Sequence, residues 1–134
     1  MYLLDTDVLS LLRRPDRNPG VARWFDGVAD RDLWLSAVTI GEIARGIARQ
    51  RPRDAVFAAE LDAWFATLRR DYDSRILPFG PDEAALWGDL SARLGHASAD
   101  LMIAATALTH GLTVVTRNLR HHEPTGAPVL DPGI

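Results

Sequence analysis

The sequence predicts a three-layer α/β/α fold with a parallel sheet of about five strands. Short apolar segments such as Tyr2–Leu4 have the composition of strands buried on both faces, and they alternate with longer segments of helical periodicity. Strands that alternate with helices are joined by right-handed crossovers, so helices should cover both faces of the sheet. At 134 residues the chain fits a single domain, residues 1–134.

The N-terminal half is expected to hold two strands and four helices. Thr6 or Asp7 should cap the first helix, and Pro15 should end it. Thr39 should cap the helix that follows the second strand. In chain order, the expected elements are a strand at 2–4, a helix at 6–14, a short helix at 21–28, a strand at 33–38 and helices at 39–50 and 54–70.

The C-terminal half is expected to add three strands and two helices. Pro78 lacks the N–H that a central ladder needs, so its strand belongs at an edge of the sheet. Gly95 and Gly111 should end the two helices, and the second helix is apolar nearly all round and therefore buried. These elements are a strand at 75–79, helices at 81–94 and 98–108, and strands at 112–116 and 128–130.

The composition excludes several classes of chemistry. All 15 basic residues are Arg, so no mechanism can use a Lys amine, and the absence of Cys excludes thiolate and disulfide chemistry. The net charge of -3 argues against a protein held to nucleic acid by bulk charge. No apolar run reaches the roughly 18 residues of a membrane span and no secretory signal is recognisable, so we expect a cytoplasmic protein without a membrane partner.

Carboxylates lie at comparable places along the predicted sheet. Asp5 and Asp7 follow the first strand. Glu42 lies in the first helical turn after the second strand, and Asp100 lies in the first turn of the buried helix. The carboxyl ends of parallel strands meet at one edge of the sheet, where ligands usually bind. Like charges gathered there repel one another unless a cation neutralises them, and hard oxygen ligands favour Mg²⁺ or Mn²⁺ over Zn²⁺.

Each carboxylate also has a purely structural interpretation. Thr39 and Glu42 have the spacing of a helix capping box. Asp100 is placed to stabilise a helix dipole, and either Asp5 or Asp7 is placed to cap the first helix. No single acid indicates a metal site, but their shared placement at one edge of the sheet favours a metal site over separate helix-capping roles.

Arg45 and Arg49 lie one and two turns beyond Glu42 on the same predicted helix. A carboxylate-bound cation activates water and stabilises charge on phosphate oxygens, and guanidinium groups beside it could hold substrate phosphates. This pattern indicates phosphodiester hydrolysis, whereas the alternative for both arginines is a solvated helix face. The pair His121-His122 is interpreted as an exposed loop rather than as metal ligands.

Five segments, 3–10, 35–46, 75–79, 100–108 and 114–118, resemble in order and spacing PIN-domain proteins of the VapC toxin type. The resemblance covers essentially the whole chain. It implies a PIN-like fold and a magnesium- or manganese-dependent endoribonuclease that cleaves RNA. It also implies a homodimer and a toxin that is neutralised by a cognate VapB-like antitoxin, with a segment of that antitoxin lying in a groove near the active site.

The resemblance assigns the site residues by position. The catalytic acids of the family fall on Asp5, Glu42 and Asp100, which are therefore the expected metal ligands. The fourth site of the family falls on Asn118, a neutral amide and hence a weak ligand. The expected substrate-binding residues are Thr6, Arg45, Arg49, Thr116 and Arg117.

Two positions depart from the pattern of the family. The common Asp-Thr-Asn opening is Asp5-Thr6-Asp7 here, which adds Asp7 as a candidate metal ligand. An Asp-Phe pair often follows the Thr-Arg-Asn motif, and His121-His122 stands in its place.

Two other functions compete with the nuclease. The opening Asp5-Thr6-Asp7 also fits haloacid-dehalogenase-like phosphatases, in which the first Asp is a nucleophile, but those enzymes need a Lys that this chain lacks. The chain could instead be a catalytically inactive PIN module that binds a partner through the same acidic cluster. Metal-dependent RNA cleavage by the purified protein separates these functions.

Overall fold

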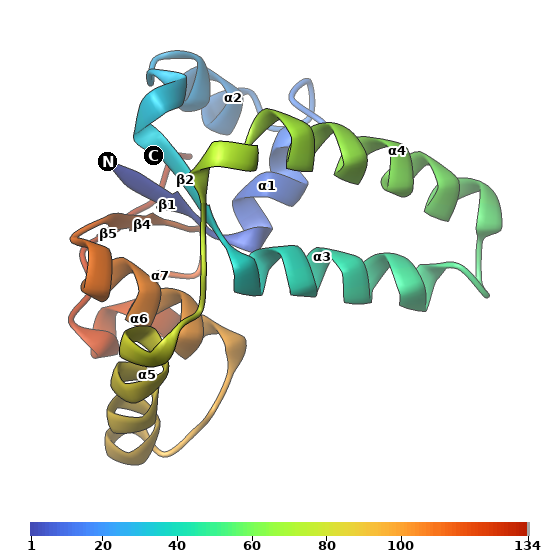
Figure 1. Ribbon diagram of the computed structural model, residues 1–134. Coiled ribbons are helices and arrows are strands. Elements are labelled where there is room, and N and C mark those ends of the chain that lie inside the picture. Colours follow the sequence, from blue (N-terminus) through green and yellow to red (C-terminus); the bar gives the residue numbers. More distant parts are fainter. Residues whose placement is uncertain (134) are drawn as a thin grey trace.

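A five-stranded parallel sheet forms the centre of the protein in the computed structural model, which describes residues 1–133 (Figure 1). The strand order is β3-β2-β1-β4-β5, so β1 lies in the middle and pairs with both β2 and β4. The predicted parallel sheet is therefore confirmed. The strands are β1 (Tyr2–Leu4), β2 (Leu33–Ser36), β3 (Ile76–Leu77), β4 (Thr113–Val115) and β5 (Val129–Leu130).

Helices connect the strands, as the periodicity predicts. They are α1 (Thr6–Leu12), α2 (Pro19–Asp26), α3 (Ala37–Gln50), α4 (Ala55–Asp71), α5 (Pro81–Leu94), α6 (Ala99–His110) and α7 (Leu119–His122). Within residues 1–133, no helix combines the length and apolar character that a membrane span requires.

Alternate side chains of the strands point to two separate cores, which gives the three layers. Leu4 and Val115 belong to the core that α1, α2, α3 and α4 cover. Leu3 and Val114, their neighbours along the same strands, belong to the core that α6 covers. The pair α3 and α4 lies side by side and extends beyond the sheet, while α5 packs on α6 at the opposite side (Figure 1). The predicted α/β/α architecture is thus confirmed.

The helix α6 is buried as its composition predicts. Its buried residues are Leu101, Ile103, Ala104, Ala105, Thr106 and Ala107. The small Ala side chains leave room for α6 to lie close to the sheet on one side and to α5 on the other. Because α6 is fixed in this way, Asp100 in its first turn has a defined position.

The helix caps differ in part from the prediction. Of the three residues considered as the cap of α1, Asp5 forms it, because its backbone is extended and its side chain accepts the N–H of Thr6, whereas Thr6 and Asp7 are wrong. The cap predicted at Thr39 is also wrong. The second strand ends at Ser36, two residues earlier than predicted, because Oγ of Ser36 accepts the N–H of Val38 and starts α3 there. Thr39 therefore lies inside α3 and is fully buried, so it forms no capping box with Glu42.

The side chain of Glu83 links the start of α5 to the end of α6. Its Oε2 accepts the N–H of Gly80 at 2.9 Å, and its Oε1 lies 2.8 Å from Nε2 of His110. The pKa of Glu83 lies below the usual carboxyl value because its own backbone N–H and the His110 side chain bind the ionised form. The stability that this lowered pKa provides is present above the ordinary carboxyl pKa and is lost as the pH falls through the lowered one.

Replacing Glu83 should therefore destabilise the protein in a pH-dependent way. We expect Glu83→Gln to lower the free energy of unfolding by about 1–2 kcal/mol at neutral pH, because the charge-assisted bonds to Gly80 and His110 weaken. The difference from the unsubstituted protein should shrink as the pH falls below about 4. Urea unfolding at a series of pH values measures both effects.

Asp82→Asn provides the matched control, because Asp82 is the exposed neighbour in the same first turn of α5. It should change the free energy of unfolding by only a few tenths of a kcal/mol, about the helix-dipole effect of an exposed acid. An equal loss in Glu83→Gln at acidic and neutral pH would contradict this account.

Candidate active site

The acidic residues singled out in the sequence come together at the carboxyl edge of the sheet. Asp5 directly follows β1, the central strand. Glu42 lies on α3, which begins where β2 ends, and Asp100 lies in the first turn of α6. The start of α3 and the start of α6 approach this edge from opposite faces of the sheet, and the two helices contact each other.

Asp5 is a buried carboxylate held by hydrogen bonds from separate elements. The residue is 3% exposed. Its Oδ1 accepts the N–H of Thr6 at 2.8 Å, and its Oδ2 accepts from Oγ1 of Thr116 at 2.8 Å and from Nε2 of His122 at 3.0 Å. Burial alone would raise the pKa of Asp5. The hydrogen bond and the charge of His122, together with the hydrogen bonds from Thr116 and Thr6, outweigh this effect and lower the pKa. Asp5 is therefore ionised at neutral pH.

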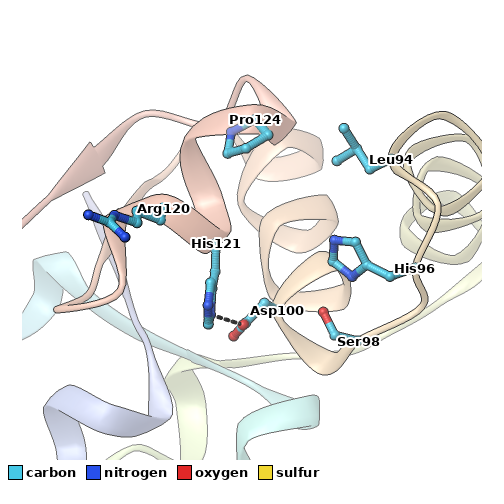
Figure 2. A pocket seen from close by; sticks show the side chains of 7 residues that line it. All are labelled: Leu94, His96, Ser98, Asp100, Arg120, His121 and Pro124. Carbon is cyan, nitrogen blue, oxygen red and sulfur yellow. Dashed lines mark hydrogen bonds and ion pairs between the residues drawn. The ribbon is translucent and has the colours of Figure 1, made fainter.

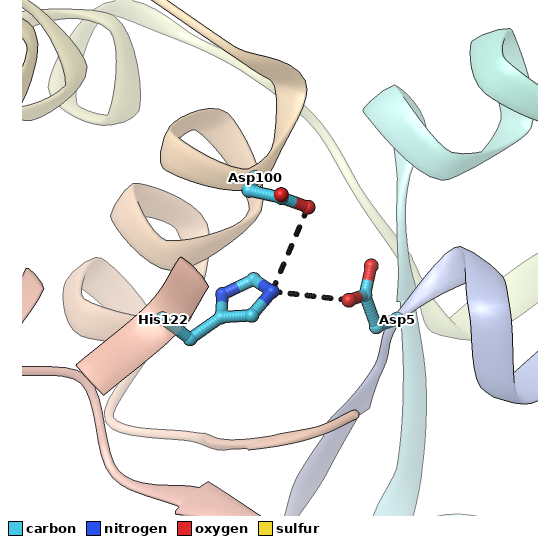
Figure 3. A group of neighbouring side chains, drawn as sticks. All are labelled: Asp5, Asp100 and His122. Atoms are coloured by element: carbon cyan, nitrogen blue, oxygen red, sulfur yellow. Dashed lines mark hydrogen bonds and ion pairs between the residues drawn. The ribbon is translucent and has the colours of Figure 1, made fainter. Parts of the chain in front are cut away.

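His122 lies at the centre of the site, so its interpretation as part of an exposed loop is wrong. The residue ends α7 and is fully buried. Its Nε2 lies 3.0 Å from Oδ2 of Asp5 and 3.7 Å from Oδ1 of Asp100, and Figure 3 shows this one ring nitrogen facing both carboxylates. Burial lowers the pKa of His122, but the bond to Asp5 and the charges of Asp5, Asp100 and Asp7 raise it more. When it is protonated, the imidazole balances part of the negative charge of these carboxylates.

The two adjacent histidines have different environments because α7 is helical. Successive helical residues point about 100° apart, so His121 faces outward while His122 faces inward. Nδ1 of His121 lies 2.9 Å from Oδ2 of Asp100 at the exposed side of the site. Leu119 and His122, three residues apart, share the inner side of α7, and this spacing is the one signal in the sequence that could have identified the buried histidine.

Glu42 belongs to the same cluster of charges at a greater distance. Its Oε1 accepts a hydrogen bond of 2.7 Å from Oγ1 of Thr6. Partial burial raises the pKa of Glu42, and the charges of Asp5 and Asp100 add to that rise. The tight group consists of Asp5, Asp100 and His122, whose potential ligand atoms all lie within 4.8 Å of one another.

Asp7 and Asn118, the two further candidate ligands, occupy the rim of the site. Oδ2 of Asp7 accepts the N–H of Arg117 at 3.1 Å, and Oδ1 is buried without a hydrogen-bond partner among the described residues. Burial and the charge of Asp5 raise the pKa of Asp7 to about 6. Asn118 is exposed, and its backbone N–H donates to Oγ1 of Thr116 at 2.9 Å. This bond shapes the turn that leads from β4 into α7.

The candidate substrate-binding residues fall into two groups. Thr116 is fully buried, and its hydroxyl donates to Asp5. The hydroxyl of Thr6 donates to Glu42, and Thr6 also lines a groove beside Glu42. Both threonines therefore position carboxylates. The Nε of Arg117 pairs with Oδ1 of Asp131 at 3.0 Å. Arg45 and Arg49 are exposed and line, with Gly46 and Glu42, a hollow of about 160 Å³.

A pocket of about 430 Å³ opens on the other side of Asp100 (Figure 2). The arginine Arg120 and the histidines His96 and His121 stand around it, with Ser98 at the start of α6. Figure 2 shows His121 bonded to Asp100 within this pocket. The site therefore has basic side chains on both sides of its carboxylates.

The donor set fits a divalent cation. Two carboxylates and an imidazole lie close enough to bind one ion, and a third carboxylate, Glu42, adds charge from the same edge. A cation at this position would relieve the repulsion that raises the pKa of Glu42 and Asp7. With a cation bound, the site would carry positive charge next to the exposed side chains of Arg45 and Arg49.

Similarity to known proteins agrees with this geometry. The chain is 38% identical over 125 residues to Toxin FitB of Neisseria gonorrhoeae, covering 88% of each chain. It is 32% identical over 139 residues to VapC ribonuclease Y4jK of Sinorhizobium fredii, covering 98% of this chain and 97% of that relative. Its fold matches the crystal structure of FitAcB from Neisseria gonorrhoeae with a TM-score of 0.76 and 31% identity, covering 98% of both chains.

The family model described as the PIN domain matches residues 2–126, a stretch that contains all five candidate metal ligands: Asp5, Asp7, Glu42, Asp100 and Asn118. Since this match and the two relatives span nearly the whole chain, the protein belongs to the PIN-domain family.

Proposed function

We propose that the protein is a metal-dependent endoribonuclease that acts as the toxin of a VapBC-type toxin–antitoxin module. The observation that carries this proposal is the convergence of Asp5, Glu42 and Asp100 at the carboxyl edge of the sheet. The names of the relatives support it, since one is called a toxin and another a VapC ribonuclease. Such a module acts on cellular RNA, so we place the protein in the cytoplasm.

We propose that Asp5 and Asp100 hold Mg²⁺ or Mn²⁺, with Glu42 close by. When bound, a divalent cation lowers the pKa of water and stabilises the negative charge that develops on phosphate oxygens. The protein supplies the positioning: Thr6 and Thr116 fix the two oxygens of Asp5, and Thr6 also orients Glu42. Carboxylates that are held by such bonds keep their geometry without the cation.

We propose that RNA approaches over the exposed arginines. Arg45 and Arg49 stand beside Glu42, and Arg120 stands beside the pocket at Asp100, so guanidinium groups flank the carboxylates on both sides. Guanidinium groups bind phosphates through paired hydrogen bonds. Single-stranded or looped RNA suits this surface better than a duplex, because unstacked nucleotides can reach recessed carboxylates.

Two alternatives differ from this function in their chemistry. A haloacid-dehalogenase-like phosphatase is opposed by the PIN-domain match and by the absence of Lys. An inactive PIN module that only binds a partner would keep the fold but would not cleave RNA. A cleavage assay with purified protein, freed of any antitoxin, distinguishes the enzyme from this binding module.

Substitution of the carboxylates tests the proposed metal site. We expect Asp5→Asn, Glu42→Gln and Asp100→Asn each to reduce Mg²⁺- or Mn²⁺-dependent RNA cleavage by about a hundredfold or more, since each removes charge from the site. Gel analysis of a labelled RNA measures cleavage, and circular dichroism shows whether each variant is folded.

Asp89→Asn is the matched control, because Asp89 is an exposed carboxylate on α5, outside the cluster. It should cleave RNA at the rate of the unsubstituted protein. Full activity in Asp5→Asn, or undiminished cleavage in excess chelator, would contradict the metal site.

The ends of the cleaved RNA test which nucleophile attacks. Water activated by a cation needs no 2′-hydroxyl, and its attack on phosphorus displaces the 3′-oxygen. The products should therefore carry a 5′-phosphate and a 3′-hydroxyl, which mass spectrometry of the fragments can identify. A cyclic 2′,3′-phosphate end would indicate attack by the neighbouring 2′-hydroxyl and would refute this mechanism.

We propose that a cognate VapB-like antitoxin docks in a groove of about 270 Å³ beside Glu42. The groove lies among α1, α3 and α4, with Thr6 and Glu42 at one end and Phe57, Leu61 and Trp64 further along. A peptide with apolar side chains along the groove and a basic residue at Glu42 would fit this chemistry. Its presence would block access to the catalytic carboxylates.

A substitution at Gly46 tests this groove without disturbing the fold. Gly46 lines the groove, and a side chain added there meets no atom within 4 Å. We expect Gly46→Met to fill part of the groove and to weaken antitoxin binding, measured by isothermal titration calorimetry, by about tenfold or more.

The control for Gly46→Met is Gly41→Met. Gly41 is also exposed on α3 and also has open space around its Cα, but it does not line the groove. Gly41→Met should bind the antitoxin normally. Equal affinity of both variants for the antitoxin would place the antitoxin elsewhere.

We also infer a homodimer, as expected for a toxin of this type. The apolar residues of α4 are only partly available for such contacts, because Leu61, Trp64 and Phe65 pack against the core of their own chain. Val56, near the start of α4, is 74% exposed and remains free to contribute to an interface.

A further inference from the structure

We propose that Nε2 of His122 is a third ligand of the catalytic cation, together with Asp5 and Asp100, and that it makes the site prefer imidazole-binding transition ions over Mg²⁺. This inference rests on the proposed metal-dependent function and refines it. A site built only from oxygens suits Mg²⁺, whereas an imidazole suits transition ions such as Co²⁺ better.

The distances within the site match those between ligands of one ion. Transition ions hold nitrogen and oxygen ligands at about 2.0–2.2 Å, so two ligands at right angles lie about 3.0 Å apart and tetrahedral ligands about 3.4 Å apart. Nε2 of His122 lies 3.0 Å from Oδ2 of Asp5 and 3.7 Å from Oδ1 of Asp100. The potential ligand atoms of all three residues lie within 4.8 Å of one another.

The environment of His122 also indicates that its role lies at Nε2. The ring is fully buried, and Nδ1 has no hydrogen-bond partner in the described part of the chain. An unpaired buried nitrogen costs stability, so the contacts that favour a histidine at this position are those of Nε2. Nε2 points at the two carboxylates and gives up its proton when it binds a cation.

His121 offers an internal comparison. It also contacts Asp100, through Nδ1, but it is exposed and faces the pocket at the outer side of that carboxylate. Its nitrogen is not part of the group whose ligand atoms lie within 4.8 Å of one another. The proposal therefore assigns the ligand to one histidine of an adjacent pair.

Pulsed electron paramagnetic resonance of the protein loaded with Mn²⁺ tests the assignment directly. A ligating imidazole nitrogen couples to the electron spin of Mn²⁺, and labelling histidine with ¹⁵N shifts that coupling. We expect a histidine-nitrogen coupling in the unsubstituted protein. It should persist in His121→Gln and disappear in His122→Phe, which keeps a ring of similar size in the interior.

Metal affinities supply a second measurement. By isothermal titration calorimetry, His122→Phe should weaken Co²⁺ binding by about tenfold or more and should change Mg²⁺ binding much less. His121→Gln should leave the ratio of the two affinities unchanged. His122→Asn serves as a polar second variant, in which the histidine-nitrogen coupling should also disappear. The ¹⁵N experiment on the unsubstituted protein requires no variant to fold.

The outcomes separate this inference from the proposed function. Absence of a histidine-nitrogen coupling with Mn²⁺ bound, its loss in His121→Gln, or a failure to bind Mn²⁺ would overturn the role of His122. RNA cleavage without that coupling would leave the nuclease intact and remove His122 from the ligand set. The coupling without RNA cleavage would support the ligand and count against the nuclease.

Discussion

The buried carboxylate of Asp5 is the constraint on which the rest of the site depends. An ionised carboxylate at the end of the central strand is costly unless donors surround it, and here each donor comes from a different element: Thr6 from α1, Thr116 from the end of β4 and His122 from α7. Satisfying one charge therefore fixes how these elements meet. This explains why segments distant in the sequence converge at the middle of the sheet.

The carboxylates at this edge of the sheet still repel one another after those hydrogen bonds form. Glu42 and Asp7 have raised pKa values because burial and the charge of Asp5 act on both. Replacing such a cluster by apolar side chains often stabilises a protein, so its presence is better explained by a functional site than by the needs of the fold. A bound cation would complete the charge of this site, and the arginines around the rim extend positive charge outward to a polyanionic substrate.

Sequence patterns predicted the architecture well because periodicity and chain order determine it. Alternating strand and helix signals imply a parallel sheet, and a parallel sheet brings Asp5, Glu42 and Asp100 to one edge. The features that were not predicted depend on which side chains come into contact in the fold, and sequence patterns do not show these contacts. Ser36 competes with Thr39 for the same cap, and the four residues of α7 offer only the spacing of Leu119 and His122 as a sign that His122 is buried.

The imidazole of His122 contributes to the charge balance of the site both with and without a bound cation. A cluster of carboxylates needs a positive group both before and after a cation binds, and an imidazole can serve in each state: protonated, it bridges Asp5 and Asp100 itself, and neutral, it offers Nε2 to a cation between them. The site thereby keeps its shape when no cation is present. An apolar side chain at the same place would leave Asp5 with two donors and the cluster with more uncompensated charge. His122, which was not among the predicted ligands, therefore allows these carboxylates to be buried while they stay charged.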